Sequence, residues 1–455
     1  MDDYLSNVSG GRQMFSVTKS ETVHWQNWSG SVHVNVNQIC TPFTVEELAA
    51  IVKKAKNHNK TIRVVGAGHS FTPLVATGDV LISLKYLRGI EEVDKETHTV
   101  SVWGGTTLKE LSEALAEQGY AMENMGDINL QTIAGAISTG THGTGAHLGN
   151  IPTQITGITL MTATGELETV HSLSNQALLQ AAQVSLGMLG IIVKAEIKVL
   201  PQYSLIAHSY RLSFDDCLKQ LDALKALNRN FEFYWFPYTE TVQVKTMNRW
   251  EDHTAMPANA KQNSMLKKLV IENGLLWVMS EASKRIPKTY KAVSTMSAMG
   301  VPVGSEVNTS HLLYATPRLV KFQEMEYAVP EETLPQVLQE IKYIIKRKKC
   351  KVHFPIECRF VKQDHIWLSP SYGRNSAYVA VHMYKGMPFN EYFSIMEEIF
   401  RKYEGRPHWG KMHTCPNQEL QELYPKLQHF LDIRKRLDSA GVFMNDYLRD
   451  LFQVS

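Results

Sequence analysis

The 455-residue sequence has few cysteines, no long apolar run and almost no excess of either charge. Its five cysteines are odd in number and form no CxxC pair, so neither a disulfide framework nor a cysteine metal site is expected. No segment approaches the roughly 18 apolar residues of a membrane-spanning helix. We therefore expect no membrane span. Because 47 basic residues nearly balance 45 acidic ones and cluster only over residues 346–351, we also expect no nucleic-acid partner.

The N-terminus, MDDYLSNVSGGRQMF, has no apolar core followed by a small-residue cleavage site, so we expect no signal peptide. Together with cysteines that we interpret as reduced thiols, this predicts a cytoplasmic protein. A hydrophobic fraction of 44% and a charged fraction of 20% are typical of a folded soluble chain. The length favours about two or three domains over a single core.

The first half of the chain alternates short strands with capped helices. Thr44 and Glu47 predict a capping box for a helix over 45–60. Thr107 and Glu110 predict a second one, with Gly119 as the stop of that helix. Further apolar segments predict strands and one hairpin, at residues 61–65, 80–84, 99–105, 157–170 and 191–200.

The character of the sequence changes near residue 202, where we place a domain boundary. Beyond it come an aromatic strand over 231–238, a helix over 334–349, and strands over 352–360 and 378–385. The tail from about residue 406, with HWGKMH and a helix-rich end, is expected to return to the first domain.

A glycine-rich turn, VVGAGHSFTPL from Val64 to Leu74, ends an apolar run. Successive backbone N–H groups in such a turn form a concave anion site. A Rossmann fingerprint needs a third glycine where this sequence has Phe71, so that class is disfavoured. A turn with no ligand is the alternative, but a second loop of similar character, STGTHGTG over 138–145, suggests one extended, phosphate-bearing ligand between the two.

These motifs carry a resemblance. VGAGHSF, GDINLQTIAGAISTGTHGTG and HWGK together resemble the vanillyl-alcohol-oxidase type of flavoprotein, within it the aldonolactone oxidase and alditol oxidase group. The resemblance runs from about Asn27 to near the C-terminus and is weak over 205–325. It implies an α+β fold, with a two-subdomain PCMH-type FAD-binding domain and an α+β cap domain whose sheet is mainly antiparallel. The expected parts are a flexible arm (1–24), the FAD domain (25–202), the substrate or cap domain (203–405) and a C-terminal segment that completes the active site (406–455).

The resemblance implies FAD as cofactor, attached covalently through His69, the histidine of the GHS motif. The alternative is that His69 is only a hydrogen-bonding turn residue. The other cofactor-binding residues that the resemblance implies are Val65, Gly66, Ala67, Gly68, Ser70, Gly126, Asp127, Thr132, Gly135, Ala136, Ser138, Thr139, Gly140, Thr141, His142, Gly143 and Ile192.

The segment 352–360 alternates, so that Glu357 and Arg359 share the face opposite its apolar residues. Alone, such a pair is more often a surface ion pair. The resemblance implies instead that Glu357 and Arg359 bind substrate hydroxyls. It also implies that Asp127, His382 and Lys411 belong to the active site as catalytic residues. For His382 a buried structural histidine is the alternative. Two histidines five residues apart in HWGKMH, without a carboxylate cluster, fit a metal site poorly, so no metal is expected.

Met125-Gly126-Asp127 bears on the reaction. The residue matching Gly126 lies against the flavin in this family, and a glycine leaves room for oxygen, which favours an oxidase over a dehydrogenase. Alditol oxidases have a serine where this chain has Asp127. The expected activity is therefore oxidation of a sugar 1,4-lactone of the L-gulono or D-arabinono type, with O₂ reduced to H₂O₂.

Three alternatives stay open from the sequence. One is an alditol oxidase of the same family, acting on xylitol or sorbitol. Another is a nicotinamide-fed flavin reductase, as in the cell-wall enzyme that reduces a UDP-sugar on a related fold. The third is a binding module that uses the two glycine-rich loops for another nucleotide.

Overall fold

The computed structural model describes residues 22–251, 274, 277–315 and 320–454. Its N-terminal part holds the hairpin of β1 (Val23–Gln26) and β2 (His33–Val36), followed by a three-stranded parallel sheet in the order β3-β5-β4. These strands and the helix that packs on them are β3 (Gln38–Cys40), β4 (Ile62–Val65), β5 (Val80–Ser83) and α1 (Val45–Asn57).

The predicted capping box of α1 is only half formed. The Thr44 side chain accepts a hydrogen bond from the Glu47 N–H at 3.2 Å, as predicted. The Glu47 carboxylate, however, accepts from the N–H of Phe43 at 2.8 Å and not from Thr44. The helix ends at Asn57, three residues earlier than predicted, and Asn59 beyond it adopts a positive φ of 53°.

A five-stranded antiparallel sheet in the order β10-β9-β11-β7-β6 follows. This sheet confirms the hairpin predicted over 157–170 and the strands predicted over 99–105 and 191–200. The second capping box is complete, and Gly119 ends that helix with a φ of 80°. The elements of this part are β6 (Ile90–Asp94), β7 (Thr99–Trp103), α2 (Leu108–Glu117), β8 (Tyr120–Ala121), α3 (Ile133–Ser138), β9 (Ile155–Met161), β10 (Leu167–His171), α4 (Gln176–Ala182), β11 (Ile191–Lys198) and β12 (Leu200–Pro201).

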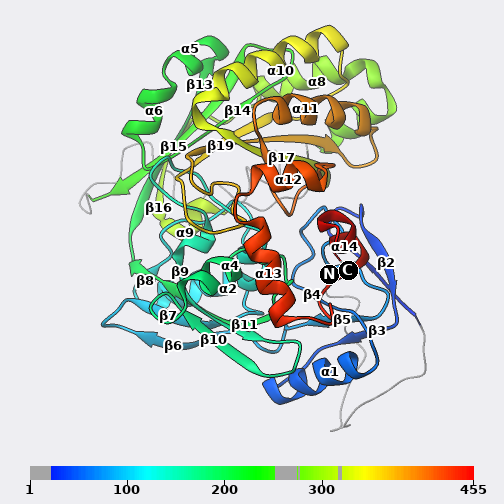
Figure 1. Cartoon of the computed structure of the whole chain (residues 1–455). Coiled ribbons are helices and arrows are strands. Elements are labelled where there is room, and N and C mark those ends of the chain that lie inside the picture. The colour runs from blue at the N-terminus through cyan, green and yellow to red at the C-terminus, as the bar shows by residue number, and fades with distance from the viewer. Residues whose placement is uncertain (1–21, 252–273, 275–276, 316–319, 455) are drawn as a thin grey trace.

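The second half of the chain builds an eight-stranded antiparallel sheet in the order β16-β13-β15-β14-β18-β19-β17-β20. Its strands are β13 (Ser204–Ser213), β14 (Asn230–Trp235), β15 (Thr241–Trp250), β16 (Gly304–Thr309), β17 (Phe322–Pro330), β18 (Ile356–Val361), β19 (Ser376–Tyr384) and β20 (Arg406–Pro407). Helices α5 (Phe214–Lys219), α6 (Leu221–Leu227), α10 (Leu334–Lys348) and α11 (Asn390–Lys402) share one apolar core with it. They lie above the sheet in Figure 1, next to α8 (Tyr290–Met299), while α9 (Ser310–Tyr314) lies below.

One predicted strand starts later than the sequence pattern indicated. We expected it to begin at Val352, but β18 begins at Ile356. The preceding Pro355 has no N–H group and cannot donate to a strand ladder, which accounts for the later start. The predicted alternation holds within β18, because Ile356, Cys358 and Phe360 enter the core while Glu357 and Arg359 face the other way.

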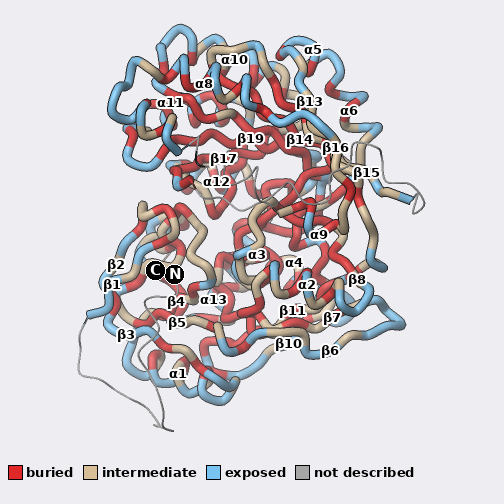
Figure 2. Tube along the Cα trace, turned by 180° about the vertical axis from the view of Figure 1, so that it is seen from behind, coloured by how far each residue is buried: buried red, intermediate tan, exposed pale blue. Residues whose placement is uncertain are grey.

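The C-terminal segment returns to the first part of the chain through α12 (Asn417–Leu423), α13 (Leu427–Leu437) and α14 (Asp446–Phe452). The Ile62 N–H donates to the Val442 carbonyl at 2.8 Å, and the Thr72 hydroxyl donates to the Trp409 carbonyl at 2.9 Å. Figure 2 shows that the buried segments run through the middle of the molecule, where the large sheet meets the lower half.

The limits of the predicted domains stay predictions. β13 begins at Ser204, next to the predicted boundary at 202, whereas Val23 and His24 of the predicted arm already lie in β1. Residues 1–21 of that arm lie outside the described residues. Within the described residues, no helix has the length and apolar character needed to cross a membrane.

One buried histidine predicts that the folded protein is less stable at acidic pH. His353 is fully buried, its Nε2 lies 3.0 Å from the Ser280 hydroxyl, and burial lowers its pKa from 6.5 to about 4. Between pH 6.5 and 4 the unfolded state therefore binds a proton that the folded state does not, so stability falls as the pH falls.

We expect His353→Gln to reduce the loss in free energy of unfolding between pH 7 and pH 5 by about 2 kcal/mol. Urea unfolding at the two pH values measures this loss, with substitution of the exposed His33 by glutamine as control. An equal loss in wild type and His353→Gln would contradict the assignment.

Candidate active site

The glycine turn and the second glycine-rich loop line one cavity of about 290 Å³. The glycine turn follows the C-terminal end of β4. The second loop follows α3, and the N-cap residue of that helix, Thr132, also lies at the cavity. Of the predicted cofactor-binding residues, the cavity is lined by Val65, Gly66, Ala67, Gly68, His69, Ser70, Thr132, Gly135, Ser138, Thr139 and Ile192.

The residues of this cavity fit an anionic dinucleotide such as FAD. Gly68 has a φ of 66°, which turns the backbone into the left-handed region. Within the described part of the chain, the N–H groups of residues 67–70 donate to no protein acceptor, so they remain available to a phosphate. A Cβ on Gly66 would lie 2.3 Å from the Thr132 hydroxyl oxygen, so only glycine lets the two loops approach this closely.

His69 lies at the end of the turn where the C-terminal segment arrives. Its ring is half-buried, with its centroid 5.4 Å from that of Trp28. Burial, with the charge of Lys411, lowers the pKa of His69 to about 4, so its imidazole is neutral at pH 7. The Phe71 N–H donates to the Gly410 carbonyl at 2.7 Å, which brings the HWGK segment next to the glycine turn.

A second, smaller cavity of about 70 Å³ holds all five predicted catalytic residues: Asp127, Glu357, Arg359, His382 and Lys411. Gly126, Thr141 and His142 also line it. Gln131 lines both cavities, and its side-chain amide donates to the Thr141 hydroxyl at 3.3 Å. The two cavities are therefore neighbours that share Gln131 as part of their walls.

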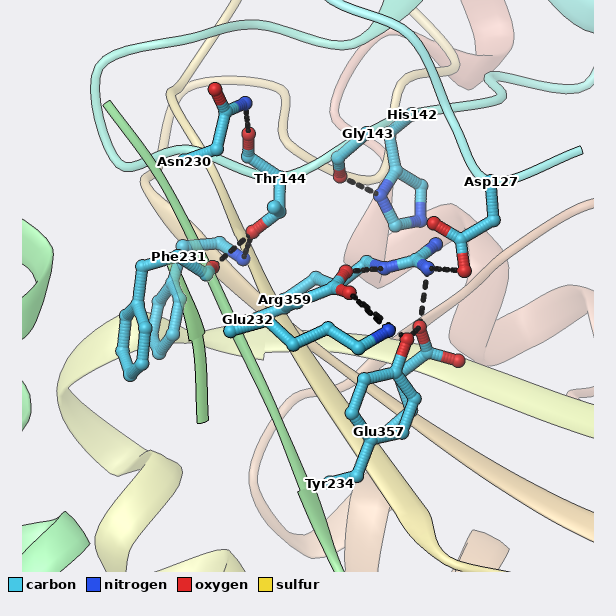
Figure 3. A network of polar contacts seen from close by, with 12 residues as sticks. Asp127, His142, Gly143, Thr144, Asn230, Phe231, Glu232, Tyr234, Glu357 and Arg359 are labelled. Carbon is cyan, nitrogen blue, oxygen red and sulfur yellow. Dashed lines mark hydrogen bonds and ion pairs between the residues drawn. The ribbon is translucent and has the colours of Figure 1, made fainter. Parts of the chain in front are cut away.

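Arg359 lies among three carboxylates (Figure 3). Its Nη2 is 2.6 Å from Asp127 Oδ2 and also contacts Glu357, while its Nε donates to Glu232 Oε2 at 3.0 Å. Burial opposes the charge, but Asp127, Glu357 and Glu232 outweigh it and raise the pKa of Arg359 well above its usual range. The predicted Glu-x-Arg pair is therefore buried, and the surface ion-pair alternative is wrong.

Glu232 was not predicted as a site residue. It lies on β14 directly opposite Arg359 of β18, and Tyr234 on the same face donates to Glu357 Oε1 at 2.8 Å. Alternation was the available signal, because Phe231, Phe233 and Trp235 enter the core. The strong aromatic character of this strand hid the two polar residues between them.

Glu324 and Glu326 of β17 were also missed. They face the second cavity, while Met325 and Tyr327 enter the core. Glu324 forms an ion pair with Lys411 and lies 3.4 Å from His382 Nε2. Burial opposes ionisation of Glu324, but Lys411 and His382 lower its pKa to about 2.

His142, Glu326 and His408 form a buried cluster whose ligand atoms lie within 4.8 Å of one another. The His142 Nδ1 lies 2.8 Å from the Gly143 carbonyl, and its Nε2 lies 3.4 Å from Glu326. The Nδ1 of His408 accepts from the Gly410 N–H at 3.1 Å. Burial and Lys411 lower the pKa of His408 to about 3 despite Glu326. The hydrogen bond to His408 Nδ1 and the nearby Lys411 ammonium group both oppose a metal ion at this cluster. The expected absence of a metal stays a prediction.

Three predicted cofactor-binding residues line neither cavity. Ala136 is in the apolar core, and Gly140 adopts a φ of 73° beside Pro370. Gly143 packs so tightly that a Cβ would lie 2.2 Å from the Met125 carbonyl oxygen. These residues shape the loop that carries Thr139, Thr141 and His142 past the two cavities.

The chain is similar to known lactone-oxidising proteins over nearly its whole length. The family model described as D-arabinono-1,4-lactone oxidase matches residues 195–451, and the one described as FAD binding domain matches residues 36–171. The L-gulono-1,4-lactone dehydrogenase of Mycobacterium tuberculosis is 37% identical over 93% of this chain and 98% of its own length. The L-gulonolactone oxidase of Mus musculus is 31% identical over 94% and 98%.

A solved structure shows the same fold. The crystal structure of cholesterol oxidase from B. sterolicum superposes with a TM-score of 0.83 over 94% of this chain and 96% of that chain, at 16% identity. The expected α+β fold and the resemblance inferred from the motifs are confirmed. By these matches, the chain belongs to the D-arabinono-1,4-lactone oxidase family of PCMH-type flavoproteins, and it is an FAD-dependent oxidoreductase.

Proposed function

We propose that this protein is an FAD-linked oxidase of a sugar 1,4-lactone of the L-gulono or D-arabinono type. The observation that carries the proposal is the polar second cavity, next to the cofactor cavity, in which Arg359 and Lys411 lie among carboxylates. Relatives named for such lactones match nearly the whole chain, which supports the substrate class.

FAD, when bound along the glycine turn and the Thr132–Thr139 segment, supplies the acceptor for a hydride from the carbinol carbon. Glu357 and Asp127 offer oxygens that accept hydrogen bonds from substrate hydroxyls and so orient the reacting carbon. Arg359 and Lys411 stabilise negative charge that develops on the hydroxyl oxygen as its proton passes to His382, which lines the same cavity. Because both cations are already held by carboxylates, they need little reorganisation during the reaction.

We further propose that His69 carries the FAD covalently. The imidazole is neutral at pH 7 and can therefore act as a nucleophile towards the cofactor. It also lines the cofactor cavity beside Ser70, near the segment that brings in Lys411.

Oxygen is the proposed final acceptor, and Gly126 provides a test. A Cβ at this position would lie 2.9 Å from the His142 carbonyl oxygen, so Gly126→Ala places a methyl group in the wall of the second cavity. We expect the ratio of peroxide-forming turnover to turnover with an artificial dye acceptor to fall. An unchanged ratio would count against oxygen access at this glycine.

Asp127 is the proposed determinant of lactone over alditol oxidation. Its carboxylate pairs with Arg359, whereas a serine cannot, and alditol oxidases have the serine. We expect Asp127→Ser to raise the ratio of kcat/KM for xylitol to that for L-gulono-1,4-lactone by about tenfold. Asp127→Asn, which keeps the shape without the charge, is the control, and an unchanged ratio in the serine variant would exclude this role.

Steady-state turnover of the wild type tests the proposed substrate class. We expect L-gulono- or D-arabinono-1,4-lactone to be turned over with a higher kcat/KM than xylitol or sorbitol. A clear preference for the alditols would replace the proposal by its alternative.

The five cysteines are free and buried, which supports the proposed cytoplasmic location.

A further inference from the structure

Arg63 of β4 is a buried cation in the wall of the cofactor cavity, with a side chain that reaches three distant segments. The residue is 3% exposed. Its Nε donates to the Leu74 carbonyl at 2.7 Å, and its Nη2 donates to the Leu186 carbonyl at 2.5 Å. Its Nη1 donates to the carbonyls of Gly187, at 3.1 Å, and Phe443.

Each of the carbonyl groups that accept these hydrogen bonds belongs to a residue at the cofactor cavity. Leu74, Leu186, Gly187 and Phe443 all line it, together with Arg63. The guanidinium therefore holds together one wall of the cavity, which is built from segments up to 380 residues apart in the sequence. Lysine, with a single ammonium group, cannot reproduce this fork of donors.

The charge of Arg63 is not matched by a contacting carboxylate. Among the described residues, its hydrogen-bond partners are all carbonyl groups. Burial lowers its pKa to about 10, with Asp438 opposing, so the guanidinium stays charged at pH 7. A buried cation without a contacting counter-ion favours an anion in the cavity that it lines, and the diphosphate of FAD is one.

The C-terminal loop around Phe443 is also held by a second side chain. Asn445 donates through Nδ2 to the carbonyls of Pro73 and Ala76, each at 2.8 Å, on either side of the wall residues Leu74 and Val75. The Asp438 carboxylate accepts from the N–H groups of Val442 and Phe443, at 2.9 and 2.8 Å, and so shapes the loop. The loop that Arg63 contacts is thus a defined structure, docked on the cavity wall.

We propose that Arg63 couples FAD binding to docking of the C-terminal segment 438–446, so that the bound cofactor and the docked segment stabilise each other. The dianionic cofactor offsets the buried charge of Arg63, and the charged guanidinium holds the carbonyls of the cavity wall. The coupling depends on FAD in this cavity but not on the substrate, so it can fail or succeed independently of lactone oxidation.

Hydrogen exchange tests the coupling without any variant. Protein purified from riboflavin-limited cells is compared with the flavin-loaded protein, and helix α10 serves as the folding reference. We expect the amides of residues 438–446 to exchange about tenfold more slowly when FAD is bound, with no change in α10. Equal exchange of 438–446 in the two forms would overturn the proposal.

Arg63→Lys provides the second test, with Arg434→Lys as its matched control. Arg434 is also buried and donates to the Asp438 carbonyl at 3.2 Å, but it does not line the cofactor cavity. We expect Arg63→Lys to incorporate less flavin in the cell and to lose the flavin-dependent protection of 438–446, while Arg434→Lys keeps both. Wild-type flavin content and protection in Arg63→Lys would contradict the proposal.

Discussion

Replacing Arg359 by lysine is expected to lower kcat/KM for the lactone by about 10²–10³-fold, the cost of losing one preorganised hydrogen-bond donor in a closed site. The guanidinium uses Nε for Glu232 and Nη2 for Asp127 and Glu357, all within a buried cluster. A lysine ammonium offers a point charge that cannot serve these directions at once. The surrounding carboxylates would then repel one another and displace the substrate hydroxyls.

Steady-state kinetics at several lactone concentrations measure this effect, with flavin content and thermal unfolding recorded for each variant. Lys245→Met is the matched control, because Lys245 Nζ lies 3.4 Å from Glu232 but does not line the second cavity. We expect the control to stay within a few-fold of wild type, since its partner is held by Arg359 as well. Activity of Arg359→Lys equal to that of the control would remove Arg359 from the catalytic set.

Replacing His69 by alanine is expected to abolish acid-stable flavin. The histidine lines the cofactor cavity at the end of the glycine turn, and burial with Lys411 keeps its imidazole neutral at pH 7. Since a covalent link raises the potential of a flavin, we also expect a lower reduction potential and slower turnover in any His69→Ala protein that still binds FAD.

Acid precipitation measures the link, because covalent flavin stays in the pellet and dissociable flavin stays in the supernatant. We expect a yellow pellet from the wild type and from His33→Ala, which removes an exposed histidine, and a colourless pellet from His69→Ala. A yellow His69→Ala pellet would show that another residue carries the flavin.

Local signals in the sequence predicted the individual elements of the fold well. The helix caps at Thr44 and Thr107 and the turn at Gly119 depend on neighbouring residues only, and the structure contains all three. The late start of β18 shows the limit of such signals. Alternation of apolar residues continued through Pro355, although this residue cannot join a strand ladder.

The candidate site was only partly predictable, because it is built across strands that are distant in sequence. Alternation places Glu357 and Arg359 on the polar face of β18 but does not reveal that β14 and β19 are its neighbours. Glu232 and Glu324 therefore escaped prediction, although each lies on the polar face of its own strand. The motif resemblance supplied Lys411 and His382, whose positions no local pattern could connect with Glu357.

Anaerobic mixing with candidate reductants tests whether this flavoprotein oxidises a sugar 1,4-lactone. The visible absorbance of the oxidised flavin is followed after mixing with L-gulono-1,4-lactone, xylitol or NADPH. We expect rapid bleaching by the lactone, slower bleaching by xylitol and none by NADPH. Bleaching by xylitol or NADPH without bleaching by a gulono- or arabinono-lactone would contradict the proposed substrate class.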